Sequence, residues 1–76
     1  MTANVHTLDA RGLNCPLPIL RTKKAVSGLD SGEVLEITAT DPGSVKDMAS
    51  FCSQTGHELL FSGQTNAGFV FRIRKG

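Results

Sequence analysis

The apolar positions of the chain follow two different periods, which predict four strands and two helices. Short segments with alternating or clustered apolar residues are typical of strands, and these are residues 5–10, 33–39, 57–63 and 69–75. Two intervening segments, 16–27 and 41–56, have helical spacing and end at Gly28 and Gly56. Residues 64–68 predict the last turn, in which Asn66 and Gly68 are suited to positive φ. The predicted order of elements is therefore βαβαββ.

This order predicts how the elements are arranged in space. A strand–helix–strand unit favours a right-handed crossover, so the first two strands should be parallel. The fold class that follows is α+β, a two-layer α/β sandwich in which a four-stranded mixed sheet carries both helices on one face. The length fits one domain, residues 1–76. Both helices should begin at the same edge of the sheet, beyond the carboxyl ends of parallel strands, where α/β proteins tend to place their chemistry.

The charge balance argues against a nucleic-acid or membrane partner held by electrostatics. The 76 residues contain 8 Lys and Arg against 7 Asp and Glu, a formal net charge of +1. The N-terminal segment lacks the apolar region of a signal peptide, and no apolar run is long enough to span a bilayer. We therefore expect a cytoplasmic protein that binds no membrane.

Two cysteines carry the candidate chemistry, and their contexts differ. No CxxC is present, so a zinc site and a dithiol redox motif both lack their usual spacing, and no metal or organic cofactor is implied. Cys52 lies on the predicted second helix, where it should be a small buried hydrophobic residue. It shares its expected apolar face with Val45, Met48, Ala49 and Phe51.

Cys15 stands in the sequence Cys15-Pro16-Leu17-Pro18, at the predicted start of the first helix. The residue before a proline is disfavoured in the α region, which suits an N-cap, and proline is well tolerated at the first helical position. We expect Cys15 to be the N-cap and the two prolines to fix its direction. The positive end of the helix dipole should then lower the pKa of this cysteine and make it a nucleophile. The alternative is a passive cap, although Ser, Thr, Asp and Asn are the preferred residues there.

The predicted outer side of the first helix is a candidate docking surface. Leu17, Leu20, Arg21 and Lys24 fall together there, with Lys23 nearby. Exposed leucines flanked by cations beside a nucleophile suit a protein partner, but single exposed leucines are also common on ordinary surfaces. Asp41 precedes a proline at the start of the second helix. It is expected to be a helix cap, with partner contact as the alternative.

The segment "LDARGLNCPLPILRTKKAV" resembles the TusA/SirA family of small sulfur-carrier proteins. The family signature is C-P-x-P at the start of the first helix, preceded here by Leu8-Asp9 and Gly12-Leu13. The segment "ATDPGSVKD" is similar to the family's D-P segment opening the second helix. The resemblance covers essentially the whole chain.

The resemblance implies that Cys15 accepts a sulfur atom as a persulfide and passes it on. The donor would be a cysteine desulfurase or a rhodanese-type transferase, and the acceptor a second protein. Such carriers serve tRNA thiolation, molybdenum-cofactor metabolism or dissimilatory sulfur oxidation. Some carriers in tRNA thiolation have an acidic residue in place of Leu17, which favours a role in sulfur oxidation or general sulfur trafficking. We expect a relay protein, monomeric when free, rather than a stand-alone turnover enzyme.

Two other function classes compete with this interpretation. A small RNA- or tRNA-binding module can share the layout of a sheet with two helices, and Arg72, Arg74 and Lys75 are the basic cluster on a predicted strand. The balanced charge and the absence of an aromatic stacking pattern argue against it. A thiol–disulfide oxidoreductase would need a resolving cysteine where Pro18 stands.

Overall fold

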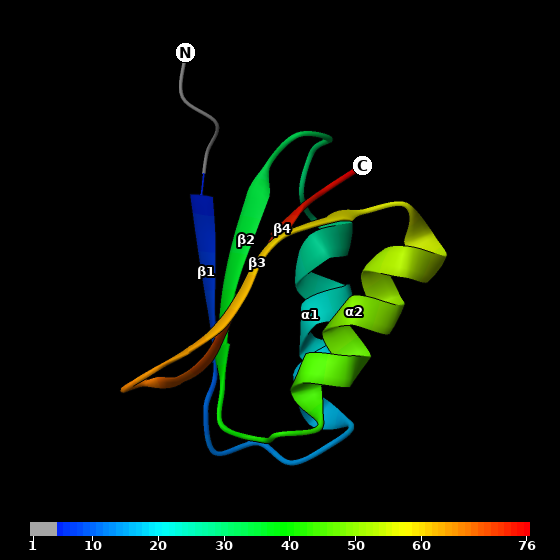
Figure 1. Cartoon of the computed structure of the whole chain (residues 1–76). Coiled ribbons are helices and arrows are strands. Elements are labelled where there is room, and N and C mark those ends of the chain that lie inside the picture. Colours follow the sequence, from blue (N-terminus) through cyan, green and yellow to red (C-terminus); the bar gives the residue numbers. More distant parts are fainter. Residues whose placement is uncertain (1–4) are drawn as a thin grey trace.

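The computed structural model describes residues 5–76, so the first four residues of the expected 1–76 domain lie outside the described part. Six elements follow one another in the predicted order (Figure 1). They are β1 (Val5–Ala10), α1 (Leu17–Ser27), β2 (Val34–Ala39), α2 (Ser44–Thr55), β3 (Glu58–Thr65) and β4 (Gly68–Arg74).

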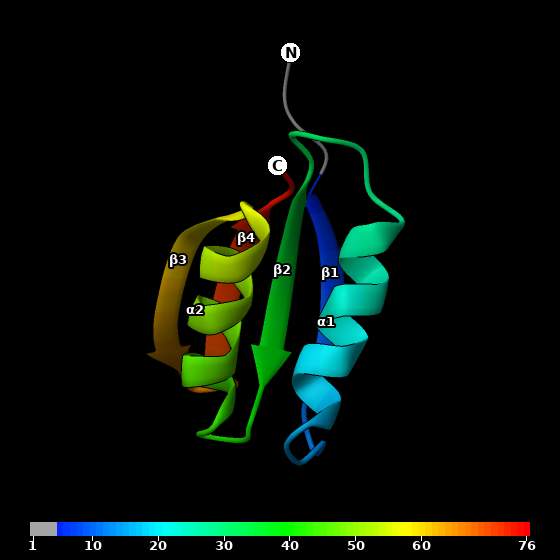
Figure 2. The ribbon, with the colours of Figure 1, turned by 90° about the vertical axis from the view of Figure 1, so that its right-hand side faces the viewer.

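The four strands form one mixed sheet in the order β1-β2-β4-β3. The central strands β2 and β4 are antiparallel, β3 pairs with β4 in the same way, and β1 is parallel to β2. Both helices lie on the same face of this sheet (Figure 2), which makes two layers. The α+β two-layer sandwich with a parallel first crossover is therefore confirmed.

Burial of apolar side chains between the two layers explains why these segments form these elements. The central strands contribute Leu35, Ile37, Phe71 and Ile73, each at most 2% exposed. The helices add the buried side chains Ile19, Val26, Met48, Phe51 and Cys52. On α2 the buried face is narrower than predicted, because Val45 and Ala49 are exposed while Ser44 is buried. The Ser44 hydroxyl can be buried because it donates a 2.6 Å hydrogen bond to the Asp41 carbonyl.

The hairpin between β3 and β4 is tighter than predicted. Thr65 pairs with Gly68, so only Asn66 and Ala67 form the loop. Gly68 has φ 129°, and a Cβ there would lie 2.5 Å from the Ala39 carbonyl oxygen, so this position requires glycine. Asn66 has no positive φ, so only half of the predicted turn chemistry is confirmed.

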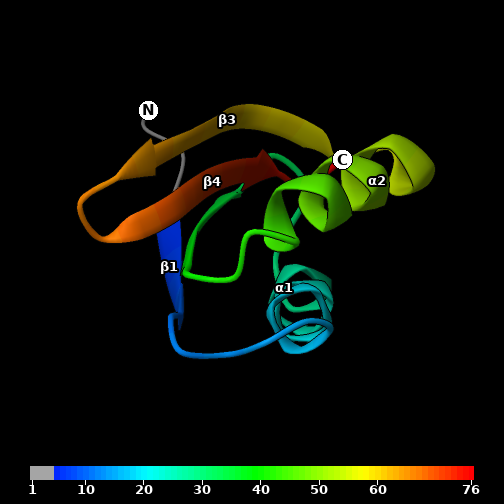
Figure 3. The same cartoon turned by 60° about the horizontal axis from the view of Figure 1, so that its bottom comes forward.

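The parallel β1–β2 crossover brings two loops to one edge of the sheet. The loop after β1 leads into α1 and the loop after β2 leads into α2, and both lie at the bottom of Figure 1, which Figure 3 brings forward. A Cβ built on Gly43, in the second loop, would lie 4.0 Å from the Cβ of Cys15, in the first. The C-terminus lies at the opposite end. Residues 28 positions apart in the sequence therefore share one small surface.

Candidate functional site

Cys15 lies in the loop between β1 and α1, with an exposed side chain. The helix begins at Leu17, one residue later than predicted, and its N-cap is Pro16, which follows a cis peptide bond. No side chain caps the helix. The prediction that Cys15 is the N-cap and Pro16 the first helical residue is therefore wrong. Cys15 instead precedes the cap and lies just outside the helix.

The two prolines reduce the number of N–H donors at this helix start. Neither Pro16 nor Pro18 has an N–H group. The Leu17 N–H donates to the Asn14 carbonyl at 2.8 Å, so it is used within the loop. The Pro16 carbonyl accepts from the Leu20 N–H at 3.2 Å, which closes the first helical turn. The helix start therefore holds the backbone near Cys15 but presents few N–H donors to a negatively charged sulfur.

The Cys15 thiol donates a hydrogen bond to a carboxylate whose contact with this cysteine was not predicted from the sequence. Its Sγ lies 3.4 Å from Oδ2 of Asp47, in the first turn of α2. This hydrogen bond, then partial desolvation, then the negative charges of Asp47 and Asp41 raise the pKa of Cys15 above its ordinary value. The predicted lowering of this pKa is therefore wrong. A full negative charge at hydrogen-bond distance outweighs the partial positive charge of a helix end.

Asp41 lies in the loop before α2 and does not cap the helix. The N-cap of α2 is Gly43, and no side chain makes a cap hydrogen bond. The Asp41 carbonyl accepts the Ser44 N–H at 3.1 Å, while its side-chain Oδ2 is buried and accepts no hydrogen bond from the described residues. The expected capping role is therefore wrong, and the carboxylate faces the Cys15 loop instead.

The outer face of α1 is exposed as predicted. Leu17 is 43% and Leu20 51% exposed, and Arg21, Lys23 and Lys24 are exposed as well. None of the three cations forms an ion pair within residues 5–76. Two of these cations line a hollow of about 750 Å³, whose walls are Leu8, Arg21, Lys24, Ala25 and Gly28. An apolar surface with unpaired cations thus lies on the helix that begins beside Cys15.

Cys52 is buried on α2, at 5% exposure, as predicted. Burial raises the pKa of this thiol, because desolvation disfavours the thiolate. No disulfide links the two cysteines. Only Cys15 is therefore open to a reagent or to a partner protein.

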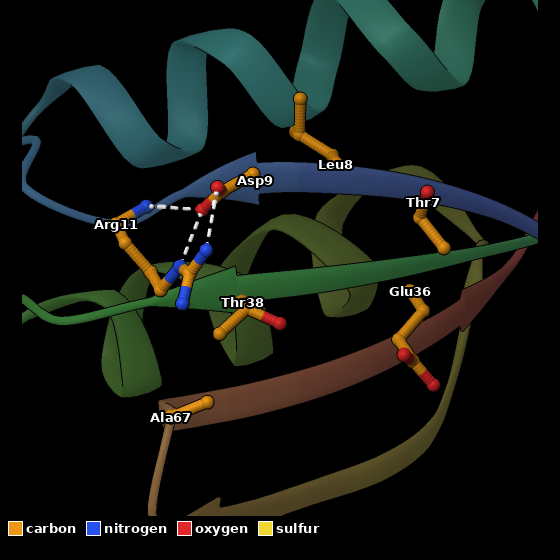
Figure 4. A pocket seen from close by; sticks show the side chains of 7 residues that line it. All are labelled: Thr7, Leu8, Asp9, Arg11, Glu36, Thr38 and Ala67. Carbon is orange, nitrogen blue, oxygen red and sulfur yellow. Dashed lines mark hydrogen bonds and ion pairs between the residues drawn. The ribbon is translucent and has the colours of Figure 1, made fainter.

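On the open face of the sheet, basic side chains form ion pairs with neighbouring acidic side chains. Arg72 pairs with Glu36 at 2.8 Å, and Arg74 pairs with Glu58. Near the end of β1, Asp9 and Arg11 form a two-pronged ion pair beside a hollow of about 310 Å³ (Figure 4). These pairs leave little net positive charge for phosphate groups, which weakens the case for an RNA-binding module.

Two further kinds of feature are absent from residues 5–76. No group of three or more His, Cys, Asp or Glu side chains there is arranged to hold a metal ion. No helix of this part is both long and apolar enough to cross a membrane.

Comparison with known proteins agrees with the resemblance. The family model described as "Sulfurtransferase TusA" matches residues 6–75. The sulfur carrier protein TusA of Allochromatium vinosum is 57% identical over 68 residues, which are 90% of each chain. The putative sulfur carrier protein YrkI of Bacillus subtilis is 49% identical over 91% of this chain and 92% of its own. The crystal structure of a SirA-like protein from Desulfitobacterium hafniense superposes with a TM-score of 0.80 at 26% identity, covering 95% of this chain and 97% of that one.

Proposed function

Because the chain belongs to the TusA family, we propose that it is a sulfur carrier that holds sulfane sulfur as a persulfide on Cys15. The observation that carries this proposal is the contrast between the two cysteines: Cys15 is exposed at a loop edge, whereas Cys52 is buried. A carried sulfur must be reached by two different proteins in turn. Of the two thiols, only that of Cys15 meets this requirement.

The proposed transfer exchanges one persulfide for another without net oxidation. The Cys15 sulfur attacks the terminal sulfur of a donor persulfide, a new S–S bond forms at Cys15, and the donor's S–S bond breaks. The donor leaves as a thiol with the proton that Cys15 gives up. Delivery runs the same step in reverse, with an acceptor cysteine as the attacking thiol. No metal or organic cofactor is needed for this exchange.

We propose that the partners are a protein sulfur donor, of the desulfurase or rhodanese type, and a protein acceptor. The docking surface would be formed by the exposed outer side of α1, with Asp41 at its edge; its members are Leu17, Leu20, Arg21, Lys23 and Lys24. A small surface suits transient complexes, and unpaired cations speed encounters with acidic partners. Pro16 and Pro18 would hold the sulfur at the end of this surface. We take residues 1–76 as one carrier domain that acts in the cytoplasm.

Mass spectrometry after incubation with a persulfide donor protein tests the proposal. The wild-type chain and Cys52→Ala should gain the mass of one sulfur atom, and tandem spectra should locate it on Cys15. Cys15→Ser should gain none while remaining folded, because the replaced side chain is exposed. Sulfur found on Cys52, or loading of Cys15→Ser, would overturn the assignment.

A further inference from the structure

The proton on Cys15 has a defined acceptor, which the family signature does not include. Sγ of Cys15 donates to Oδ2 of Asp47 at 3.4 Å and so links the loop after β1 to α2. Asp47 is half-buried and adjoins Met48, which is completely buried in the core. The packing of α2 on the sheet therefore sets the position of this carboxylate, while the thiol is on a loop.

A second carboxylate strengthens the negative field at the sulfur. Asp41 faces the same loop with a buried Oδ2 that accepts no hydrogen bond from the described residues. The space is tight, because a Cβ on Gly43 would lie 3.0 Å from that oxygen and 4.0 Å from the Cβ of Cys15. The negative charges of Asp47 and Asp41 both act on the Cys15 thiol and help to raise its pKa.

The cations around this edge do not cancel that field. On the β1 side, Arg11 is engaged by both carboxylate oxygens of Asp9. On α1 the first cation is Arg21, four residues after the helix begins, or about 6 Å along its axis. Lys46 is next to Asp47 in the chain, but its side chain is exposed. Cys15 is therefore held in a locally acidic corner of a nearly neutral protein.

Loading with sulfur removes the atom that Asp47 binds. In the transfer step, the hydrogen on Sγ is replaced by a second sulfur at the end of a bond of about 2.05 Å. Sγ then has no proton to donate. An ionised terminal sulfur would also be repelled by both carboxylates. The same side chain must therefore interact in opposite ways with the two states of Cys15.

We propose that Asp47 distinguishes the empty carrier from the loaded one: it holds the empty thiol by a hydrogen bond, and it releases and repels the persulfide. In the empty state the thiol stays protonated, which protects it from oxidants and stray electrophiles, since the thiolate is the reactive form. In the loaded state the terminal sulfur turns away from α2 towards the solvent, where a partner can reach it. The second half rests on the proposed function, whereas the first half concerns the empty protein alone.

The first experiment measures the rate of Cys15 alkylation by iodoacetamide against pH in the unloaded protein. The variants are Asp47→Asn, which removes the charge at nearly constant size, and Asp47→Glu, which restores it. Asp30→Asn is the matched control, because it removes the same charge from an exposed residue in the loop after α1. Melting curves establish that each variant is folded.

Asp47→Asn should react with a midpoint at lower pH than the wild type and several-fold faster at pH 7, since each pKa unit changes the thiolate fraction about tenfold. Asp30→Asn should match the wild type, and Asp47→Glu should lie closer to the wild type than to Asp47→Asn. A role confined to folding would not move this pH profile. Equal midpoints for the wild type and Asp47→Asn would overturn the proposal.

The second experiment compares the two states after partial loading with inorganic polysulfide. Mass spectrometry distinguishes alkylated thiol from alkylated persulfide on Cys15, so both rates come from one sample. Asp47→Asn should speed the thiol reaction much more than the persulfide reaction. An equal change in both would mean that Asp47 acts only as a nearby charge, which would refute the discrimination. A protein that cannot be loaded by any donor would fail the proposed function but would leave the first experiment unaffected.

Discussion

The unequal environments of the two cysteines predict that their substitution has unequal effects on stability. The larger effect should come from Cys52, which takes no part in the proposed sulfur transfer. Cys52 is 5% exposed and belongs to the core cluster that includes Met48 and Phe51. Cys52→Ala removes one buried sulfur atom. Its transfer from water is comparable to that of a methylene group, about 0.8 kcal/mol, and the remaining cavity adds to this. We expect a loss of about 1 to 2 kcal/mol in the free energy of unfolding.

That loss is large relative to the stability of so small a protein. At about 0.05 to 0.15 kcal/mol per residue, a chain of 76 residues has a free energy of unfolding of about 4 to 11 kcal/mol. For a domain of this size, 1 kcal/mol shifts the melting temperature by about 4 to 8 °C. Cys52→Ala should therefore melt about 4 to 16 °C below the wild type.

Circular dichroism melts and urea titrations of three proteins provide the assay. Cys15→Ser is the matched control, because its side chain is exposed and makes no cap hydrogen bond, so its melting temperature should stay within a few degrees of the wild type. Alkylation of the folded wild type should modify Cys15 and spare Cys52. An unchanged melting temperature for Cys52→Ala, or a larger loss for Cys15→Ser, would refute the assignment of Cys52 to the core.

Two further predictions concern the docking surface and the sheet edge. Leu20→Asp with Lys24→Glu should lower the free energy of unfolding by at most about 1 kcal/mol, because the main loss is the favourable interaction of the Lys24 charge with the last turn of α1. The double variant should nevertheless slow protein-to-protein sulfur transfer about tenfold or more and reduce the salt sensitivity of that transfer. Leu60→Asp is the control, because Leu60 is also exposed but lies on β3. A wild-type transfer rate in the double variant would show that the docking surface is elsewhere, with the edge around Asp41 as the next candidate. The hydrogen bonds from Arg11 lower the pKa of Asp9 from 3.8 to about 2. This pair therefore stabilises the fold at pH values above 3.8, and that stabilisation is lost as the pH falls towards 2. Carboxyl NMR should show this titration returning towards the ordinary value in Arg11→Gln, and an ordinary midpoint in the wild type would contradict the ion pair.

The layout of the fold could be predicted because it depends on periodicity and on chain connectivity. Leu35 and Ile37 alternate with polar residues on β2, and Ile19, Thr22 and Val26 recur at helical spacing on α1, and all five side chains are buried. The right-handed crossover rule then leaves few ways to place two helices on a four-stranded sheet. The ends of the helices are harder to predict from the sequence. Prolines near a helix start are compatible with several positions, and α1 begins one residue, and α2 three residues, after the predicted start.

The electrostatics of the site could not be predicted in the same way. Cys15 and Asp47 are 32 residues apart, and only the packed structure shows that their side chains meet. A signal for this contact was present, since the parallel crossover predicts that the loops after β1 and β2 share an edge. What the sequence does not reveal is which side chains of the second loop and helix point towards the first. Asp47 could equally have been an ordinary first-turn acid on α2.

Because negative carboxylates dominate the electrostatic field at Cys15, the two prolines have a different role from the one predicted. A helix start that activates a thiolate should keep its N–H donors free, yet Pro16 and Pro18 remove two of them and the Asn14 carbonyl occupies a third, that of Leu17. Such a start fixes the backbone while leaving few N–H donors to attract a negative charge. This is the combination that a carrier needs. If the empty cysteine were a strong nucleophile, it would react with many electrophiles between its two partners. A thiol that is rigidly placed but kept protonated by Asp47 can wait until a donor presents sulfur.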